Sequence, residues 1–147
     1  MNAPDPQHLR INERLKAYWE NLCKARPMPL ESDVVIEDLK DIWDWCFLVS
    51  YRDNKFSYSY LGKELIDAYG DDITGKEITE TLLYPHPVSL LSTFRQVIQS
   101  KTPGVDESEF NNSRGSAIKY RSCVMPLGAH GHDSTAFLLG GMKWKAY

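Results

Sequence analysis

The residues with the clearest capacity for metal chemistry stand together near the carboxyl end, at His130, His132 and Asp133. Two imidazoles and a carboxylate at this spacing could reach one divalent cation. No cysteine or other fourth ligand lies close to them in the sequence. The same residues are typical of a polar hairpin loop whose histidines titrate in water. Because the ligand set is incomplete, we predict that the chain holds no metal ion.

A second group of residues combines aromatic rings with a guanidinium, and it would suit a small ligand. Tyr58, Tyr60 and Tyr69 each offer an apolar body with a hydroxyl, Phe94 adds a ring, and Arg121 offers a fork for a carboxylate. These five residues are the candidate ligand-binding residues of the sequence. The alternative is that the rings belong to the core, since aromatic residues at strand spacing usually do, and that Arg121 lies on a solvated face.

Sequence patterns of common catalytic sites are missing from the chain. It contains no G-x-S-x-G elbow, no G-x-x-x-x-G-K-S/T phosphate loop and no G-x-G-x-x-G turn. Cys23, Cys46 and Cys123 lack the His and Asp or Asn context of a thiol nucleophile, and their wide spacing in apolar surroundings predicts buried free thiols. We therefore predict no catalytic residues and no enzyme activity.

Composition limits the partners of the chain. Its 147 residues are 42% hydrophobic and 12% aromatic, which suits one domain with a substantial core. With 17 basic and 20 acidic residues the net charge is −3, so no electrostatic footprint for nucleic acid is present. The first 16 residues lack the apolar core of a signal peptide, and the apolar run 136–142 is too short to span a bilayer. We expect a soluble cytoplasmic protein with no nucleic-acid or membrane partner.

The segment 55–76 organises the elements that would position these side chains. Phe56, Tyr58 and Tyr60 alternate with serines, which predicts a strand with three rings on one face. After Gly62 the apolar residues change to helical spacing, and Gly70 is placed to end that short helix in the left-handed conformation. The pattern predicts a curled sheet with short helices beside it and a small cavity between them.

The remaining elements follow from the same periodicities. Residues 1–8 are expected to form a disordered leader, and 9–25 an amphipathic helix. Short helical pieces are predicted over 32–40 and near 78–83, and a longer helix starts at about Pro87. Strands are predicted at 42–51, 56–61, 105–110, 117–127 and 134–144, with Asp53-Asn54 as the hairpin turn and 105–110 as an edge strand. Strands with helices inserted between the second and third indicate an α+β fold.

With these elements in order, the chain resembles a PAS domain, and within that fold a bacterial PAS-like family that stands alone at about this length. The matching segments are Tyr18-Trp19 on the first helix, Arg26-Pro27-Met28-Pro29 after it, Phe56, Tyr58 and Gly62 at the strand end, Gly70-Asp71-Asp72-Ile73-Thr74-Gly75 at the turn, and Pro126-Leu127 closing the fourth strand. The resemblance implies a single domain over 9–147, with an antiparallel sheet in the order 2-1-5-4-3 and a cavity between sheet and helices.

The resemblance to PAS domains implies several possible cofactors and does not select one of them. PAS haem sensors place an axial histidine on an inserted helix, and His86 between Pro85 and Pro87 has that position; a role in turn geometry is the alternative. Flavin photochemistry through a thiol adduct needs a cysteine in the helical segment, and none occurs between Gly62 and Lys101. We predict no cofactor, with an unidentified small molecule as the open alternative.

Two functions remain as hypotheses. The first is a regulatory PAS-like module in bacterial signalling that acts through protein–protein contacts. Its partner would be another protein or a second copy, as in a homodimer, and Tyr18, Trp19 and Leu22 on the first helix are the candidate interface residues, exposed on a dimer or partner surface. The alternative is that this helix covers one face of the sheet, and the apolar stripe alone does not decide between the two. The second is a small-molecule sensor with a ligand in the cavity between sheet and helices.

Overall fold

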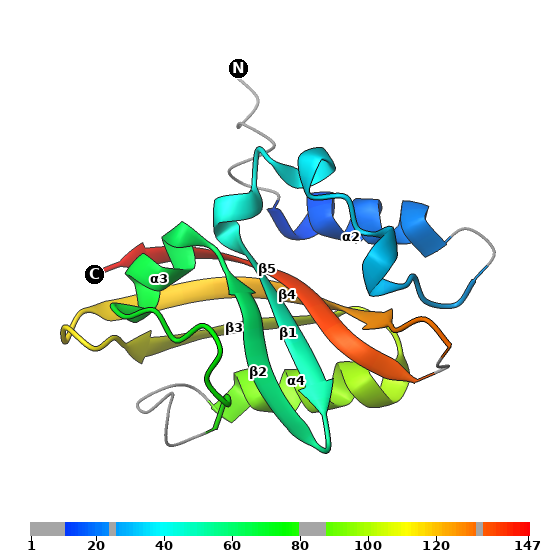
Figure 1. Ribbon diagram of the computed structural model, residues 1–147. Helices are drawn as coiled ribbons and strands as arrows, with labels where there is room; N and C mark the ends of the chain where they lie inside the picture. The colour runs from blue at the N-terminus through cyan, green and yellow to red at the C-terminus, as the bar shows by residue number, and fades with distance from the viewer. Residues whose placement is uncertain (1–10, 24–25, 80–87, 132–133) are drawn as a thin grey trace.

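The structure is a computed structural model, and it describes residues 11–23, 26–79, 88–131 and 134–147 (Figure 1). The elements in chain order are α2 (Ile11–Cys23), the 3₁₀ helices η1 (Glu31–Asp33), η2 (Ile36–Leu39) and η3 (Trp43–Trp45), β1 (Cys46–Arg52), β2 (Lys55–Leu61), α3 (Lys63–Tyr69), α4 (Val88–Ser100), β3 (Gly104–Asn111), β4 (Ala117–Gly128) and β5 (Thr135–Ala146).

The five strands form one antiparallel sheet in the order β2-β1-β5-β4-β3. This confirms the predicted α+β fold and its strand order. β5 lies at the centre, while β2 and β3 lie at the edges, as the acidic sequence of 105–110 predicts for β3. No helix within the described residues is long and apolar enough to cross a membrane.

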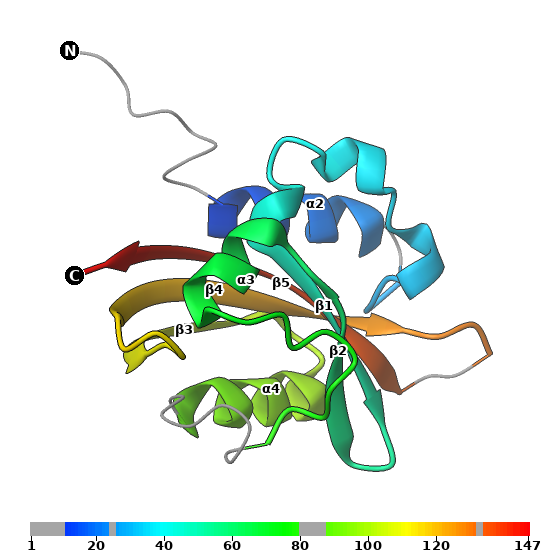
Figure 2. The same ribbon diagram turned by 60° about the vertical axis from the view of Figure 1, so that its left-hand side comes forward.

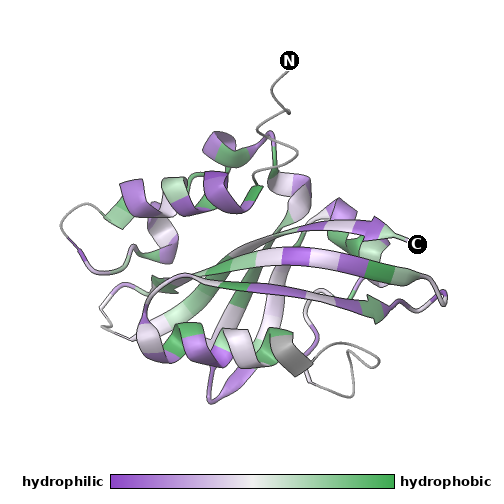
Figure 3. Cartoon of the chain, turned by 180° about the vertical axis from the view of Figure 1, so that it is seen from behind, coloured by the Kyte–Doolittle hydropathy of each residue, from purple (hydrophilic) through white to green (hydrophobic). Residues whose placement is uncertain are grey.

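The sheet lies between two layers of helices, as Figure 2 shows. α4 covers the face that we call the inner face, where Phe47, Tyr58 and Leu138 belong to one apolar cluster. α2 and the 3₁₀ helices cover the opposite, outer face, where Leu15 and Leu127 belong to a second cluster. Hydrophobic and hydrophilic bands alternate along α4 in Figure 3, because one side of that helix packs on the sheet and the other meets water.

The predicted amphipathic helix 9–25 is confirmed for the residues of α2; its predicted ends and the leader 1–8 lie outside the described residues. Ile11, Leu15 and Trp19 are buried against the outer face. Arg14 ties the helix to the following segment, because its guanidinium donates to Asp41 at 2.6 Å and to the Asp38 carbonyl at 2.9 Å. The Arg14 guanidinium lowers the pKa of the Asp41 carboxyl.

The turns of the 55–76 segment are formed as predicted. Asp53 and Asn54 have φ angles of 55° and 63°, the left-handed pair that a two-residue hairpin requires. Gly62 donates its amide to the Cys46 carbonyl at 2.9 Å, and a Cβ at Gly62 would lie closer than 3.0 Å to the Asp44 backbone. The strand can therefore pass straight into α3 only with glycine at this position, and Gly70 ends that helix at φ 80°.

The expectation that Phe56, Tyr58 and Tyr60 share one face is wrong for Tyr60. The pairing of β1 with β2 shifts by one residue between Leu48 and Val49, where Tyr58 and Tyr60 face consecutive partners. Such a bulge inserts one extra residue and reverses the facing of the residues beyond it. Phe56 and Tyr58 point to the inner face, while Tyr60 stacks on Trp43 in the outer layer with ring centroids 4.5 Å apart.

Two predicted boundaries also differ. The strand expected at 42–51 begins only at Cys46, because Trp43–Trp45 forms η3 with Trp45 donating its amide to the Ile42 carbonyl. The short helix expected over 32–40 is two separate 3₁₀ helices, since the β-branched Val34 and Val35 between them are extended. Of the helical piece predicted near 78–83, Ile78 is not helical, and its amide donates to the Phe56 carbonyl at 2.7 Å; residues 80–83 lie outside the described residues.

Candidate functional site

Three of the five candidate ligand residues meet on the inner face. Tyr58 is 1%, Tyr69 8% and Phe94 0% exposed, and all three belong to the inner cluster. Tyr58 comes from β2, Tyr69 from the last turn of α3, and Phe94 from the middle of α4. The inserted helices thus bring their rings over the sheet, as the sequence pattern suggests for this region.

Polar groups accompany these rings in the inner core. The hydroxyls of Tyr58 and Tyr69 are hydrogen-bonded at 2.9 Å, and the Tyr120 hydroxyl donates to the buried carboxylate of Asp106. Burial raises the pKa of Tyr69 to about 12, even though the hydrogen bond with Tyr58 acts in the opposite direction. Burial also raises the pKa of Tyr58 well above its ordinary value. Both phenols are therefore neutral near pH 7.

Aromatic rings fill the space between β1, β2 and α4. The Phe47 ring centroid lies 5.8 Å from that of Tyr58 and 6.0 Å from that of Phe94. Phe56 lies 5.5 Å from Phe94 on the other side. At these centroid separations the rings are in direct contact. The described side chains therefore occupy this part of the inner core themselves.

The other two candidate ligand residues lie on the outer face, away from this cluster. Tyr60 donates its hydroxyl to the Trp43 carbonyl at 3.0 Å. Arg121 is exposed and pairs with Glu107 of the neighbouring strand at 3.1 Å. The sheet separates both from Tyr58 and Tyr69, so the five residues do not line one cavity.

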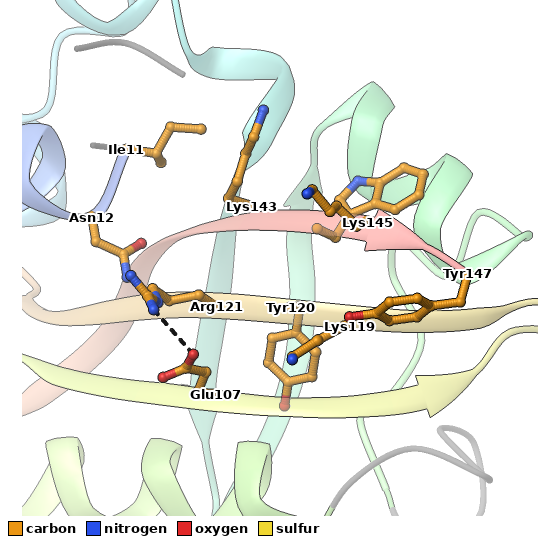
Figure 4. Close-up of a pocket in the computed structure, with 10 residues that line it drawn as sticks. Ile11, Asn12, Glu107, Lys119, Tyr120, Arg121, Lys143, Lys145 and Tyr147 are labelled. Atoms are coloured by element: carbon orange, nitrogen blue, oxygen red, sulfur yellow. Dashed lines mark hydrogen bonds and ion pairs between the residues drawn. The ribbon is translucent and has the colours of Figure 1, made fainter. Parts of the chain in front are cut away.

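Arg121 instead lies in an outer-face groove of about 320 Å³ beside the start of α2. Figure 4 shows that groove, which we call the β4–β5 groove. Its basic residues come from β4 and β5, its ends are formed by the first turn of α2 and by Tyr147, and the full lining is Ile11, Asn12, Glu107, Lys119, Tyr120, Arg121, Lys143, Trp144, Lys145 and Tyr147. Sequence reasoning found Arg121 but missed the lysines around it.

A pattern in the sequence could have indicated this groove. Lys119 and Arg121 are two residues apart, and so are Lys143 and Lys145, which places each pair on one face of its strand. Only the pairing of β4 with β5 brings the two pairs together, because even their nearest members, Arg121 and Lys143, are 22 positions apart in the sequence.

The candidate interface residues of the first helix have three different environments. Trp19 is 6% exposed and donates its indole N–H to the Pro126 carbonyl at 2.7 Å, so the expectation that it is exposed is wrong. The reason is that the apolar stripe of α2 packs on the sheet of its own chain. Tyr18 is half-buried and accepts the Val35 amide at 2.9 Å, and Leu22 is also half-buried.

An apolar surface that the sequence pattern did not single out lies beside Tyr18. Val35 is 49% and Ile36 55% exposed, and we call this pair the apolar patch. A groove of about 160 Å³ adjoins it, lined by Glu31, Val34, Ile36, Trp43, Leu48, Tyr60 and Leu139. Exposed apolar residues grouped beside a groove are one mark of an interaction site.

Most of the candidate metal and haem ligands lie outside the described residues. They are His132, Asp133 and His86, while His130 is exposed. Within the part of the chain that the structure describes, no three His, Cys, Asp or Glu side chains are placed to hold a metal ion.

Solved structures that share this fold include LOV proteins and a PAS domain. The chain is similar to a LOV protein of Rhodobacter sphaeroides, with a TM-score of 0.54 and 11% identity over 74% of this chain and 67% of that one. It is similar to a light-oxygen-voltage domain studied with a flavin analogue, with a TM-score of 0.58 and 10% identity over 76% and 83%. It is also similar to the PAS domain of a Colwellia psychrerythraea protein, with a TM-score of 0.51 and 11% identity over 78% and 98%.

At these identities the three structures show a shared fold and nothing about chemistry. A comparison with curated protein sequences gave no match. The sequence itself, however, matches the family described as PAS domain over residues 8–143, which is nearly the whole chain. That match agrees with the order of the strands, the helices inserted between β2 and β3, and the helix that precedes the sheet. The chain belongs to the PAS domain family.

Proposed function

We propose that this PAS domain is a regulatory module that acts through contacts with another protein. PAS domains form a family of signalling and sensor modules, and the resemblance found in the sequence led to the same hypothesis. The observation that carries the proposal is the apolar patch of Val35 and Ile36 on the outer layer. Neither residue belongs to the core, and both leave much of their apolar side-chain surface in contact with water.

The packing of the inner core favours a function in protein–protein contacts over the binding of a cofactor. The solved neighbours include LOV proteins, one of them studied with a flavin analogue. In this chain Phe47, Tyr58 and Phe94 fill the space under α4 with rings in mutual contact. The helical region between Gly62 and Lys101 also contains no cysteine for a thiol adduct. The described residues therefore do not fit a flavin of that type.

The patch is held in place by the first helix. The Tyr18 hydroxyl accepts the Val35 amide, and the Arg14 ion pair with Asp41 fastens the end of the same segment. A partner bound at the patch would thus act on the segment that is bonded to α2, and through it on the packing of α2 against the sheet.

Charge indicates the chemistry of the partner. Residues 31–41 carry five acidic side chains around the apolar pair; Asp33, Glu37 and Asp41 form ion pairs with Arg26, Lys40 and Arg14, which leaves Glu31 and Asp38 to give this surface its negative charge. A second copy meeting this surface symmetrically would bring acidic groups opposite acidic groups, which is unfavourable. A partner that presents apolar side chains within a basic surface would gain both apolar burial and charge complementarity. We therefore favour a different protein over a homodimer.

A photo-crosslinking amino acid at position 36 tests the proposal in the host cell, with the same group at position 55 as the matched control. The protein crosslinked only from position 36 is then purified, and its dissociation constant is measured. We expect Ile36→Ser to weaken binding about tenfold or more, as for a residue central to an interface. Val105→Ser, which changes a more exposed apolar residue on β3, should leave binding unchanged.

Three results would count against this function. Equal crosslinking from positions 36 and 55 would remove the patch as an interface. A purified partner that binds Ile36→Ser as tightly as the parent chain would do the same. A crosslinked product made of two copies of this chain would show that the patch mediates self-association and does not bind a different, basic protein.

A small-molecule sensor is the second candidate, and one observation favours it. Tyr58, Tyr69, Tyr120 and Asp106 place three hydroxyls and a carboxylate in the inner core, where apolar side chains would pack at less cost. Native mass spectrometry of protein purified from its own host tests this candidate. Bound mass that is lost in Tyr69→Phe would support it, and a mass equal to that of the chain alone would oppose it.

A further inference from the structure

The β4–β5 groove gathers positive charge on a chain whose net charge is −3. Lys119, Arg121, Lys143 and Lys145 line it, against the single carboxylate of Glu107. All four basic residues belong to the outer face of adjacent strands. Figure 4 shows Tyr120, between Lys119 and Arg121, pointing to the opposite side of the sheet.

The register of the two strands sets like charges directly opposite one another. Lys119 is the cross-strand partner of Lys145, and Arg121 is the partner of Lys143. Opposing side chains on one face lie about 5 Å apart at Cβ, and like charges at this position destabilise a sheet. Two such pairs in succession are a cost that the fold does not require, because neutral residues would pair equally well.

The rest of the surface offsets the Arg121–Lys143 pair more than the Lys119–Lys145 pair. Arg121 is bound to Glu107, and the Lys143 ammonium lies 4.1 Å from the centre of the Trp45 ring, a cation–π contact. Glu109 faces Lys119 from β3 and offsets part of its charge, but it does not line the groove. Among the described residues, neither Lys119 nor Lys145 forms an ion pair with a carboxylate. An anion between these two lysines would relieve their repulsion.

The other end of the groove carries an acceptor that lacks a donor. The Asn12 side-chain oxygen is buried, and no described group hydrogen-bonds to it. Buried polar atoms are nearly always paired, so such an atom needs an explanation. Figure 4 shows the Asn12 side chain pointing toward Arg121 at the groove end that α2 forms. A ligand hydroxyl can reach this oxygen once the Asn12 side chain turns into the groove, and it would then donate to Asn12 and accept from the Arg121 guanidinium.

We propose that the β4–β5 groove binds a sugar phosphate, with the phosphate between Lys119 and Lys145 and the sugar hydroxyls toward Arg121 and Asn12. The groove volume of about 320 Å³ lies within the range of small-molecule sites. α2 closes one end of the groove, which suits a small ligand better than an extended acidic peptide. This site is on the outer face and is independent of both candidate functions proposed for the domain.

Calorimetric titration of the full chain with ribose phosphate, inorganic phosphate and ribose tests the site. We expect ribose phosphate to bind most tightly, with an affinity that falls as salt rises. Lys119→Gln and Lys145→Gln should each weaken ribose phosphate and inorganic phosphate about fivefold or more, equal to the loss of one charge-assisted contact. Asn12→Ala should weaken ribose phosphate alone. Lys55→Gln, an exposed lysine at the β1–β2 hairpin, should change neither.

Melting temperatures provide a second readout that a structural role would not produce. Without ligand, Lys145→Gln should melt at or above the temperature of the parent chain, because it removes a like-charge pair. With ribose phosphate, the parent chain and Lys55→Gln should gain more melting temperature than Lys119→Gln and Lys145→Gln. No binding of either phosphate at millimolar concentration would overturn the proposal, as would equal binding by the Lys119→Gln and Lys145→Gln variants. Tighter binding of poly-glutamate than of ribose phosphate would assign the groove to a protein and also overturn it.

Discussion

The aromatic ring of Phe47 lies directly over Gly140, its cross-strand partner on β5. A Cβ at Gly140 would come closer than 3.0 Å to three atoms of that ring. The next residue, Gly141, has the same relationship on the outer face, where a Cβ would meet Leu15 and Ile11 of α2. Two consecutive glycines at the centre of the sheet thus let both layers approach it closely.

Gly140→Ala should destabilise the protein by about 2 kcal/mol, because the added methyl group overpacks the core against Phe47. Urea denaturation measures the change in the free energy of unfolding. The same substitution in a Phe47→Leu background should cost less than half as much, since the smaller side chain leaves space. An equal cost in both backgrounds would show that the ring does not set the requirement for glycine.

Trp19→Phe should cost about 1 kcal/mol of stability, because it removes the buried hydrogen bond to the Pro126 carbonyl and keeps most of the apolar contact. Tyr18→Phe serves as the comparison, since its hydrogen bond to Val35 is exposed and should contribute less. Denaturation curves of the two variants give the ranking. A larger effect at Tyr18 would contradict the docking of α2 on the sheet through Trp19.

Tyr69→Phe should cost about 1–3 kcal/mol, because it leaves the Tyr58 hydroxyl buried without its partner. Replacing both residues by phenylalanine removes the pair together and should cost less than the single change. This double-mutant cycle measures the coupling of the two hydroxyls. Additive effects of the two substitutions would mean that the hydroxyls are not coupled in the folded protein.

Alkaline pH should lower the free energy of unfolding because of the same buried pair, Tyr58 and Tyr69. An unfolded tyrosine loses its proton near pH 10, whereas Tyr69 keeps it to about 12 in the folded state because it is buried. Between these values the unfolded state binds fewer protons, so the free energy of unfolding falls as pH rises. The stabilisation is fully present below pH 10. Urea midpoints at about pH 8 and about pH 11 measure the loss, which should be smaller in the Tyr58→Phe/Tyr69→Phe variant.

Thiol reagents should separate the three cysteines, all of which carry free thiols. Burial raises the pKa of Cys123 to about 12 and that of Cys46 further, so neither should react in the folded protein. Cys23 is half-buried at the end of α2 and should react first. Mass spectrometry of labelled peptides gives the order, and Cys23→Ser should abolish the fast phase. Rapid labelling of Cys46 without denaturant would contradict the burial of the outer cluster.

Local patterns predicted most of the fold. The apolar stripe of Ile11, Leu15 and Trp19 predicted α2, and the change of period at Gly62 predicted the passage from β2 to α3. Each of these signals lies within a few residues of chain, where side-chain period alone selects helix or strand. The strand order was implied by the resemblance to PAS domains, and the sheet confirms it.

The candidate site was predicted less completely, and Tyr60 shows why. Its spacing from Tyr58 was right for a shared face, but one bulge in the β1–β2 pairing moved it to the outer layer. Trp19 likewise belongs to an apolar stripe that could either cover the sheet or meet a partner, and it packs on the sheet of its own chain. Neither outcome depends on residues close by in the sequence.

By itself the sequence determined that Lys119 and Arg121, and separately Lys143 and Lys145, share a face of their strands, because alternation is a local property of extended chain. Only the tertiary structure decided that these two pairs stand opposite one another beside Asn12, while Arg121 lies across the sheet from Tyr58. Strand register is fixed by contacts between segments far apart in the chain, and it alone decides which side chains meet.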